Sequence, residues 1–374
     1  MEWLDDNDAT EAACCAPRPS LLSRRAFLAA GPLICAALPS GPASAQARAL
    51  VRGSNSIDLH SHAGALIGMW RVDDGAPFGP VAAPMREGDV AVVCLAIVPD
   101  APALRSVDDT RYRPFRAPEP GELYAYGQAA FARLHSLVAD QELRLIANAG
   151  DLRSARADAP CAIVSSEGGD FLEGDPAKVD EAFHRWWLRH LQLTHYRVNE
   201  LGDIQTDPPV HGGLTAAGAE VVRRCNRLGV VVDVAHGTYD LVVQAAAVTT
   251  KPLVLSHTSL MPNPGPRMRR ISPDHAKAVA ETGGVIGIWP PINIFASIPA
   301  LAAGMARMVE AVGTDHVGLG TDMGGLIGGS CLDRYEMVPH LADALMRIGF
   351  TPDEASKLLG GNYARVATTS LPGA

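Results

Sequence analysis

Short apolar runs alternate with amphipathic stretches along most of the chain. Nine runs have the length and β-branched character of strands, at 57–60, 90–98, 143–147, 162–165, 191–195, 230–236, 253–257, 285–289 and 317–322. Helical spacing of apolar residues lies between them, as at 123–138, 176–189, 216–228 and 300–312. Strand–helix alternation predicts a parallel sheet. We therefore expect an α/β fold, a (β/α)₈ TIM-type barrel in which one of the nine strands is extra or distorted.

Most of the predicted strands end in a side chain that can bind a metal ion. These side chains are His60 and His62 in the first strand, Glu167 after the fourth, and His195, His236, His257 and Asp322 in later strands. A lone histidine at a strand end is more often an ordinary polar residue. In a barrel, however, the carboxyl ends of all strands converge on one face, where active sites form. The whole set therefore predicts a metal site.

The spacing His60-Ser61-His62 adds to this prediction. Alternation along a strand places both imidazoles on the same side, within reach of one ion. Histidine and carboxylate ligands without cysteine favour Zn²⁺, Mn²⁺ or Co²⁺. Five further histidines fall on predicted helices or loops, where surface roles are expected: His135, His184, His211, His275 and His340. Residues 71–120 are rich in Pro, Gly and charge. Outside the apolar run at 90–98, we expect this region to form mostly long loops over the barrel.

Composition narrows the function without changing the fold. The chain has 374 residues, 47% of them hydrophobic, and a formal net charge of −9. No basic cluster occurs in its body, so nucleic acid is not an expected partner. Of the seven cysteines, three lie before residue 46 and none forms a C-x-x-C pair. A thiolate zinc site is therefore not expected.

The N-terminal 45 residues have the pattern of a bacterial export signal. Arg24-Arg25 precedes a short apolar run, which ends near Ala43-Ser44-Ala45. This resembles a twin-arginine signal and predicts a periplasmic or secreted protein. The apolar run is too short for a bilayer, so no stable span is expected after signal removal. A chance arginine pair before an anchor is the alternative. We expect residues 46–374 to form a single metallo-hydrolase barrel domain.

Several short motifs in this order resemble the membrane dipeptidase (renal dipeptidase) family of zinc peptidases, and the chain looks like a bacterial exported member. They cover nearly all of residues 56–367 and include Asp58-Leu59-His60, Ser166-Glu167-Gly168-Gly169, Leu193-Thr194-His195, Asp233-Val234-Ala235-His236, Leu255-Ser256-His257-Thr258, Arg269-Arg270 with Pro273-Asp274, and Gly318-Leu319-Gly320-Thr321-Asp322.

The resemblance implies a role for each matched residue. It implies metal ligands at His60, Glu167, His236 and His257, with Glu167 bridging two ions. It implies an acidic residue near the metals at Asp322, and substrate binding by His195 and Arg270. The family pattern at the first strand is His-x-Asp, whereas this chain has His62 at the second position. We expect His62 to occupy the ligand position with different chemistry.

These residues predict a metal-dependent dipeptidase with two divalent ions, zinc being the expected metal. Two cations can activate a water molecule and polarise a scissile carbonyl. Asp322 can move a proton to the leaving amine, His195 can donate to the oxyanion, and Arg270 suits a substrate carboxylate. The expected partners are a small dipeptide and, in a homodimer, a second copy of the chain.

Two alternatives remain open at this point. One is another amidohydrolase-type metal hydrolase, acting on an N-acyl amino acid or an ester, because His-x-His opens many such barrels. That class usually has a carboxylated lysine at the position of Glu167. The other is an exported metal- or solute-binding protein without turnover, which would have no need of a proton shuttle at Asp322.

Overall fold

The fold is known from a computed structural model, which describes residues 41–66, 77–108 and 111–373. Eight strands form one parallel sheet in the order β1-β2-β6-β7-β8-β9-β10-β11. Their bounds are β1 Ile57–Ser61, β2 Val92–Ile97, β6 Cys161–Ser166, β7 Leu188–Gln192, β8 Val231–Asp233, β9 Val254–Thr258, β10 Val285–Ile288 and β11 Val317–Leu319.

The two ends of this sheet approach one another just beyond the strands. Ser61 at the end of β1 pairs in parallel with Met323, and the Asp322 N–H donates to the carbonyl oxygen of His60 at 2.9 Å. The sheet is therefore a nearly closed barrel, as expected from the sequence. Of the nine predicted strands, the extra one is that at 143–147. It forms β5 (Arg144–Leu145), which pairs only with β6 and lies off the path of the other eight.

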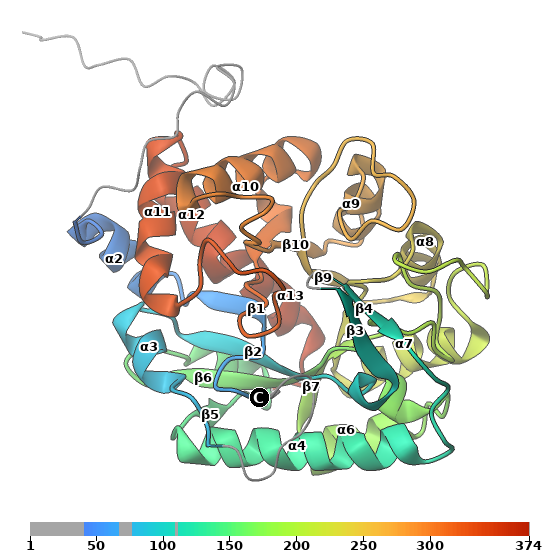
Figure 1. The fold of residues 1–374 in the computed structure, drawn as a ribbon. Helices are drawn as coiled ribbons and strands as arrows, with labels where there is room; N and C mark the ends of the chain where they lie inside the picture. The colour runs from blue at the N-terminus through green and yellow to red at the C-terminus, as the bar shows by residue number, and fades with distance from the viewer. Residues whose placement is uncertain (1–40, 67–76, 109–110, 374) are drawn as a thin grey trace, which may run out of the picture.

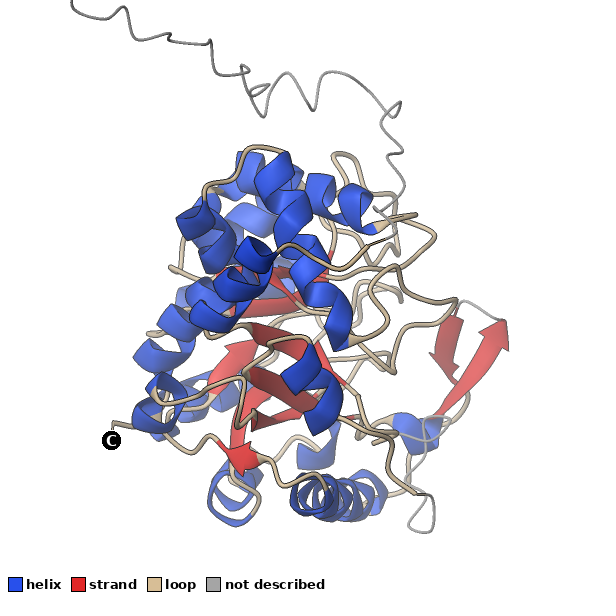
Figure 2. Ribbon diagram, turned by 90° about the vertical axis from the view of Figure 1, so that its left-hand side faces the viewer, coloured by secondary structure: helices blue, strands red, loops and turns tan. Residues whose placement is uncertain are grey.

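Helices surround the strands (Figures 1 and 2). They are α2 Ala45–Gly53, α3 Ala82–Glu87, α4 Glu122–Asp140, α5 Ala149–Arg153, α6 Lys178–Arg185, α7 Ala216–Leu228, α8 Tyr239–Val248, α9 Pro273–Ala280, α10 Ile298–Val312, α11 Val338–Arg347, α12 Pro352–Ser356 and α13 Asn362–Ser370.

Alternation along the strands divides the core into two layers. In β2, Val93, Leu95 and Ile97 pack with the surrounding helices, whereas Val92 and Cys94 belong to a second cluster with α13. Successive side chains of a strand point to opposite faces, so the second cluster lies on the inner face of the barrel. In the part of the chain described, no helix is long and apolar enough to cross a membrane.

One local prediction is wrong and another is incomplete. The helix expected at 176–189 ends earlier, since α6 ends at Arg185 and β7 begins at Leu188. Trp187 between them has φ +56°, a left-handed conformation that ends the helix although the apolar pattern continues. The region expected as loops contains an antiparallel hairpin, β3 (Leu104–Asp108) with β4 (Arg111–Pro114), which stands away from the barrel in Figure 2.

The described N-terminal part packs against the C-terminal helices. Ser44 caps α2 by accepting from the Ala47 N–H. Its own N–H and hydroxyl donate to the carboxylate of Asp343 on α11, at 2.8 and 2.6 Å. Residues 1–40, with the arginine pair, lie outside the described residues, so the predicted signal and its boundary at residue 45 stay predictions.

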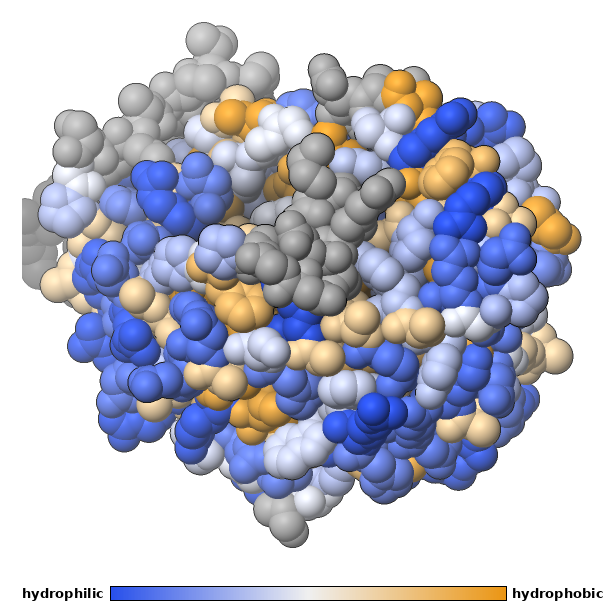
Figure 3. Space-filling model, turned by 60° about the horizontal axis from the view of Figure 1, so that its bottom comes forward, coloured by the Kyte–Doolittle hydropathy of each residue, from blue (hydrophilic) through white to orange (hydrophobic). Residues whose placement is uncertain are grey.

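The face in Figure 3 is largely polar with scattered apolar side chains.

Candidate metal centre

Glu167, the residue after β6, lies at the centre of the predicted site. Five imidazole Nε2 atoms lie within 3.5 Å of its carboxylate oxygens. Oε2 is 3.1 Å from His62 and 3.3 Å from His195, and Oε1 is 3.1 Å from His236, 3.3 Å from His257 and 3.5 Å from His60. All six side chains are buried. The barrel thus brings the predicted residues of five strands together.

His62 lies where strand alternation placed it. Its Nε2 is 3.2 Å from Nε2 of His60 and 3.6 Å from Oδ1 of Asp322. Its Nδ1 is 2.8 Å from the carbonyl oxygen of Ala96, which can only accept, so Nδ1 donates. In the neutral ring, Nε2 then presents a lone pair to the site, which is how a backbone carbonyl orients a metal-binding histidine.

The donor atoms fit a divalent cation. The Nε2 atoms approach one another in pairs. Those of His60 and His62 are 3.2 Å apart, and those of His236 and His257 are 3.1 Å apart. Lone pairs this close repel unless a cation or a proton lies between them. Three buried groups have ligand atoms within 4.8 Å of one another: His60, His62 and Asp322; His60, Glu167 and His257; and Glu167, His195 and His236. These residues can hold divalent metal.

Burial keeps three of the histidines in the form that binds metal. It lowers the pKa of His257 to about 3 and lowers the pKa values of His60 and His236 below their ordinary value. Metal binding requires neutral imidazole. Burial alone would raise the pKa of Glu167, but the surrounding histidines lower it well below its ordinary value, so it stays a carboxylate.

Asp322 and His236 are held in strained backbone conformations at the site. Their φ angles are +51° and +66°, in the left-handed region that residues other than glycine rarely adopt. Such strain costs on the order of 1–3 kcal/mol and concentrates at functional sites. Burial, together with the charge of Glu167, raises the pKa of Asp322 to about 7, which suits a group that exchanges protons near neutrality.

The sequence reasoning missed Asp100. Its Oδ1 is 2.8 Å from Nδ1 of His195, and it is fully buried. Burial alone would lower the pKa of His195, but the charges of Asp100 and Glu167 outweigh it and raise the pKa to about 9. The signal lies in strand ends that only the structure gives: Asp100 is the third residue after β2, the same offset at which His195, His236 and Asp322 follow their strands.

Both arginines of the Arg269-Arg270 pair line a cavity of about 340 Å³ next to the centre. Tyr196, Trp289 and Asp322 also line it. Arg269 is the more closely engaged: its guanidinium donates to Gln205 at 3.0 Å and to the His257 carbonyl at 3.4 Å, and lies 5.2 Å from the Trp289 ring centroid. The sequence reasoning had named Arg270, which shares the cavity.

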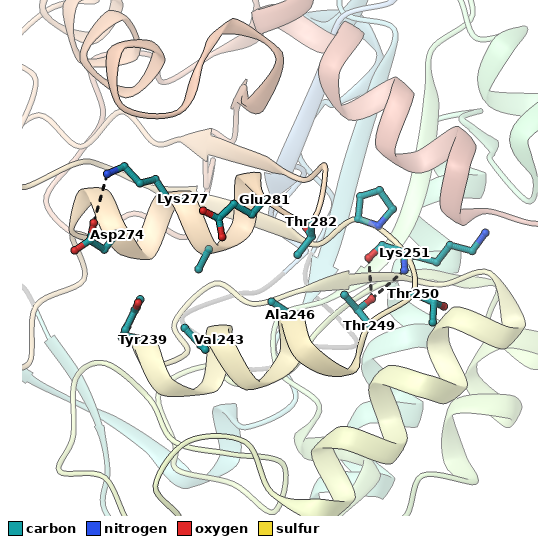
Figure 4. Close-up of a pocket in the computed structure, with 12 residues that line it drawn as sticks. Tyr239, Val243, Ala246, Thr249, Thr250, Lys251, Asp274, Lys277, Glu281 and Thr282 are labelled. Atoms are coloured by element: carbon teal, nitrogen blue, oxygen red, sulfur yellow. Dashed lines mark hydrogen bonds and ion pairs between the residues drawn. The ribbon is translucent and has the colours of Figure 1, made fainter.

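A second, wider groove lies away from this centre, on the outside of the barrel. It is about 630 Å³ and runs between α8 and α9, with Tyr239 and Val243 facing Lys277 and Glu281 (Figure 4). None of the metal-binding groups found among the described residues includes one of its lining residues. Among the described residues, the groups that can hold a metal ion therefore lie at the barrel mouth.

Comparison with known proteins agrees with this geometry. A family model for membrane dipeptidases (peptidase family M19) matches residues 44–370. Dipeptidase tcpJ of Claviceps purpurea is 28% identical over 247 residues, 63% of this chain and 56% of that protein. Dipeptidase aclJ of Aspergillus oryzae is 31% identical over 204 residues, 52% of this chain and 48% of that protein. The chain spans about half the length of these curated relatives.

Among solved structures, a metallo peptidase from Rhodobacter sphaeroides, liganded with a phosphinate mimic of the dipeptide L-Ala-D-Ala, has a TM-score of 0.70. It is 20% identical, and the match covers 84% of this chain and 99% of that one. This likeness establishes the shared barrel fold. The family match extends over most of the chain and includes every residue of the centre, so the chain belongs to the membrane dipeptidase family, peptidase family M19.

Proposed function

We propose that the protein is a metallo-dipeptidase that hydrolyses the peptide bond of dipeptides with two divalent metal ions, zinc in the native enzyme. One observation carries the proposal: both oxygens of the Glu167 carboxylate face imidazole nitrogens, Oε2 facing His62 and His195 and Oε1 facing His236, His257 and His60. A carboxylate with ligand atoms on both sides is suited to bridging two ions.

The residues divide naturally between two ions. One ion would be held by His60, His62 and Asp322. The other would be held by His236 and His257, and both ions would share Glu167. Imidazole and carboxylate donors without thiolate suit zinc. When bound, two such cations acidify a water molecule and polarise the scissile carbonyl.

Asp322 and His195 supply the proton chemistry. Asp322 lies beside His62 and lines the cavity, so it can accept a proton from the attacking water and deliver it to the leaving amine. His195 directs Nε2 toward Glu167 and can donate to the oxygen that becomes negative in the transition state. A protein that only bound metal or solute would not need Asp322 as a proton carrier.

The arginine-lined cavity supports a substrate with a free carboxylate. Arginine offers a planar fork of N–H donors that matches a carboxylate. Arg269 and Arg270 line the same cavity as Asp322, so an α-carboxylate bound there would leave the peptide bond near the centre. The dipeptide mimic bound by the Rhodobacter sphaeroides metallo peptidase supports this substrate class.

The test combines metal analysis with hydrolysis of a defined panel. The zinc-reconstituted protein should bind about two ions per chain and hydrolyse L,L- or L,D-dipeptides, with activity lost to chelators. Dipeptide amides, which lack the carboxylate, should be poor substrates. Faster cleavage of N-acyl amino acids or esters would favour another metal hydrolase, and metal binding without turnover would favour a binding protein.

Two variants separate the roles of Glu167 and Asp322. Glu167→Ala should leave at most one tightly bound ion. Asp322→Asn should lower kcat by about 10²-fold or more while losing far less metal than Glu167→Ala, because general acid–base catalysis contributes that much. Asp353→Asn on the exposed start of α12 is the matched control. Full metal content in Glu167→Ala, or a near-normal kcat in Asp322→Asn, would refute the corresponding role.

A further inference from the structure

Asp100 is a buried carboxylate whose two oxygens both serve the segment that carries His195. Oδ1 is 2.8 Å from Nδ1 of His195, and Oδ2 accepts from the Tyr196 N–H at 3.2 Å. Its side chain is fully buried, and it is not part of any metal-binding group found among the described residues. Asp100 therefore touches the site only through its neighbours.

Counting donors and acceptors shows that Nδ1 of His195 carries a hydrogen. An ionised carboxylate only accepts hydrogen bonds. Asp100 therefore requires a hydrogen on Nδ1 of His195. This orientation leaves Nε2 as the atom directed into the centre, 3.3 Å from Oε2 of Glu167.

The surroundings leave the His195 ring little freedom. Its centroid is 4.5 Å from that of Tyr196 and 4.7 Å from that of His236. Gly168 lies against its Cβ: a side chain there would meet His195 Cβ at 3.3 Å and Asp170 at 2.7 Å, and its φ is +103°. Packing thus fixes the ring position, and the hydrogen bond to Asp100 fixes its rotation.

We propose that Asp100 is a positioning residue for the reaction, acting through His195: it holds the hydrogen on Nδ1 and keeps Nε2 directed at the reacting groups. The inference rests on the proposed hydrolase function for its kinetic consequence, but the hydrogen-bond pair itself does not depend on it.

Buried carboxylates elsewhere in the chain serve other ends. Asp170 bonds to Nε of Arg197 at 2.8 Å and to Asn199 at 3.1 Å, which ties together the loops after β6 and β7. Asp343 accepts one backbone N–H and one side-chain donor from Ser44, the same pattern of bonds as Asp100, but between α11 and α2. Asp343 is therefore a matched control for the loss of a buried carboxylate.

Asp100→Asn gives a specific physical prediction. An asparagine has one acceptor oxygen and an NH₂ donor, so it cannot accept from both the Tyr196 N–H and Nδ1–H. If its oxygen keeps the Tyr196 N–H, its NH₂ faces Nδ1, which can then only accept and carries no hydrogen. The variant should thus keep the fold but remove the hydrogen from Nδ1 of His195, together with the carboxylate that orients the ring.

The experiment is ¹⁵N-histidine NMR of the zinc-loaded protein, with the His195 signals assigned by their loss in His195→Gln. The parent should show Nδ1 protonated, and Asp100→Asn should show Nδ1 unprotonated. Metal content should equal that of the parent. On a dipeptide, kcat/KM should fall about 10- to 100-fold, mainly through kcat, as for other residues that orient a site histidine. In a chain that keeps Ser44, Asp343→Asn should change neither the spectrum nor kcat/KM.

Each outcome bears on the proposal separately from the dipeptidase function. An unprotonated Nδ1 in the parent would overturn it whether or not the variant folds. Parental kcat/KM in Asp100→Asn, or a loss that parallels loss of metal, would also overturn it. If the parent hydrolyses no dipeptide, the proposed function fails, while a protonated Nδ1 that depends on Asp100 still supports the pair.

Discussion

At the scale of single residues, His62 is where this chain departs from its family's pattern. The structure orients it like a ligand, with Nδ1 donating to the Ala96 carbonyl and Nε2 3.1 Å from Glu167. A neutral imidazole in place of a carboxylate leaves the site one unit more positive. That difference should weaken the electrostatic attraction for a cation and acidify water at the site.

His62→Asp and His62→Ala test this position. Asp should keep two metals, hold them more tightly against a competing chelator, and move the acidic limb of the pH–rate profile upward. Ala should lose metal or activity, because no side chain replaces the missing donor. Metal titration and pH–rate profiles are the measurements, with the exposed His184→Ala as control. If Ala matches the parent in metal content and rate, His62 is only a neighbour.

At the scale of elements, α9 carries a histidine that the sequence placed at the surface. His275 is buried on α9, and its Nε2 has no hydrogen-bond partner in the described structure. Burial, aided by the charge of Arg269, lowers its pKa to about 4. The expectation of a surface role was wrong because a helical position alone does not tell which face is covered by neighbouring elements, here the Tyr239 ring of α8.

The low pKa predicts that acid lowers the stability of the parent. His275→Leu should make the stability less sensitive to acid. The folded pKa is below the unfolded value of about 6.5, so the unfolded chain binds more protons below pH 6.5 and the folded state loses stability as the pH falls toward 4. Between pH 7.5 and 5, the parent should lose about 2 kcal/mol more than the variant. Urea unfolding of metal-free proteins measures this, with His184→Leu as control. Equal pH slopes for parent and variant would contradict the prediction.

At the scale of the whole molecule, barrel closure creates the centre. The bridge of Ser61 to Met323 brings the first and last strands together, which places His60 and His62 beside Asp322. The same closure buries Asp58 of β1 against Thr321. The N–H and the hydroxyl of Thr321 donate to the Asp58 carboxylate at 2.8 and 2.6 Å. The ligands of the first strand therefore depend on the integrity of the ring.

Export also concerns the whole molecule. We propose that Arg24 and Arg25 direct the folded protein through a twin-arginine pathway, with a mature chain beginning near Gln46. Arg24→Lys with Arg25→Lys should retain precursor in the cytoplasm, as judged by cell fractionation and N-terminal sequencing. Cleavage before Gln46 would remove Ser44, the cap of α2, at a cost of about 1 kcal/mol. Normal processing of the double variant would argue against this route.

The sequence by itself determined the architecture and which polar residues would converge at the barrel mouth. Strand alternation is a local property, so His60-Ser61-His62 predicted two imidazoles on one side, and the strand-end positions of Glu167, His236, His257 and Asp322 followed from short apolar runs. Parallel strands place their carboxyl ends together whatever the details of packing, and for this reason the convergence of these residues was predictable.

Only the tertiary structure decided the contacts between residues that are distant in the chain. Asp100 and His195 are 95 positions apart, and no local pattern indicates that two strand ends will meet at hydrogen-bonding distance. The closer engagement of Arg269 and the marginal place of β5 likewise depend on how loops and sheet edges pack. Such contacts arise from shape and from the pairing of buried polar groups, which act only once the chain has folded.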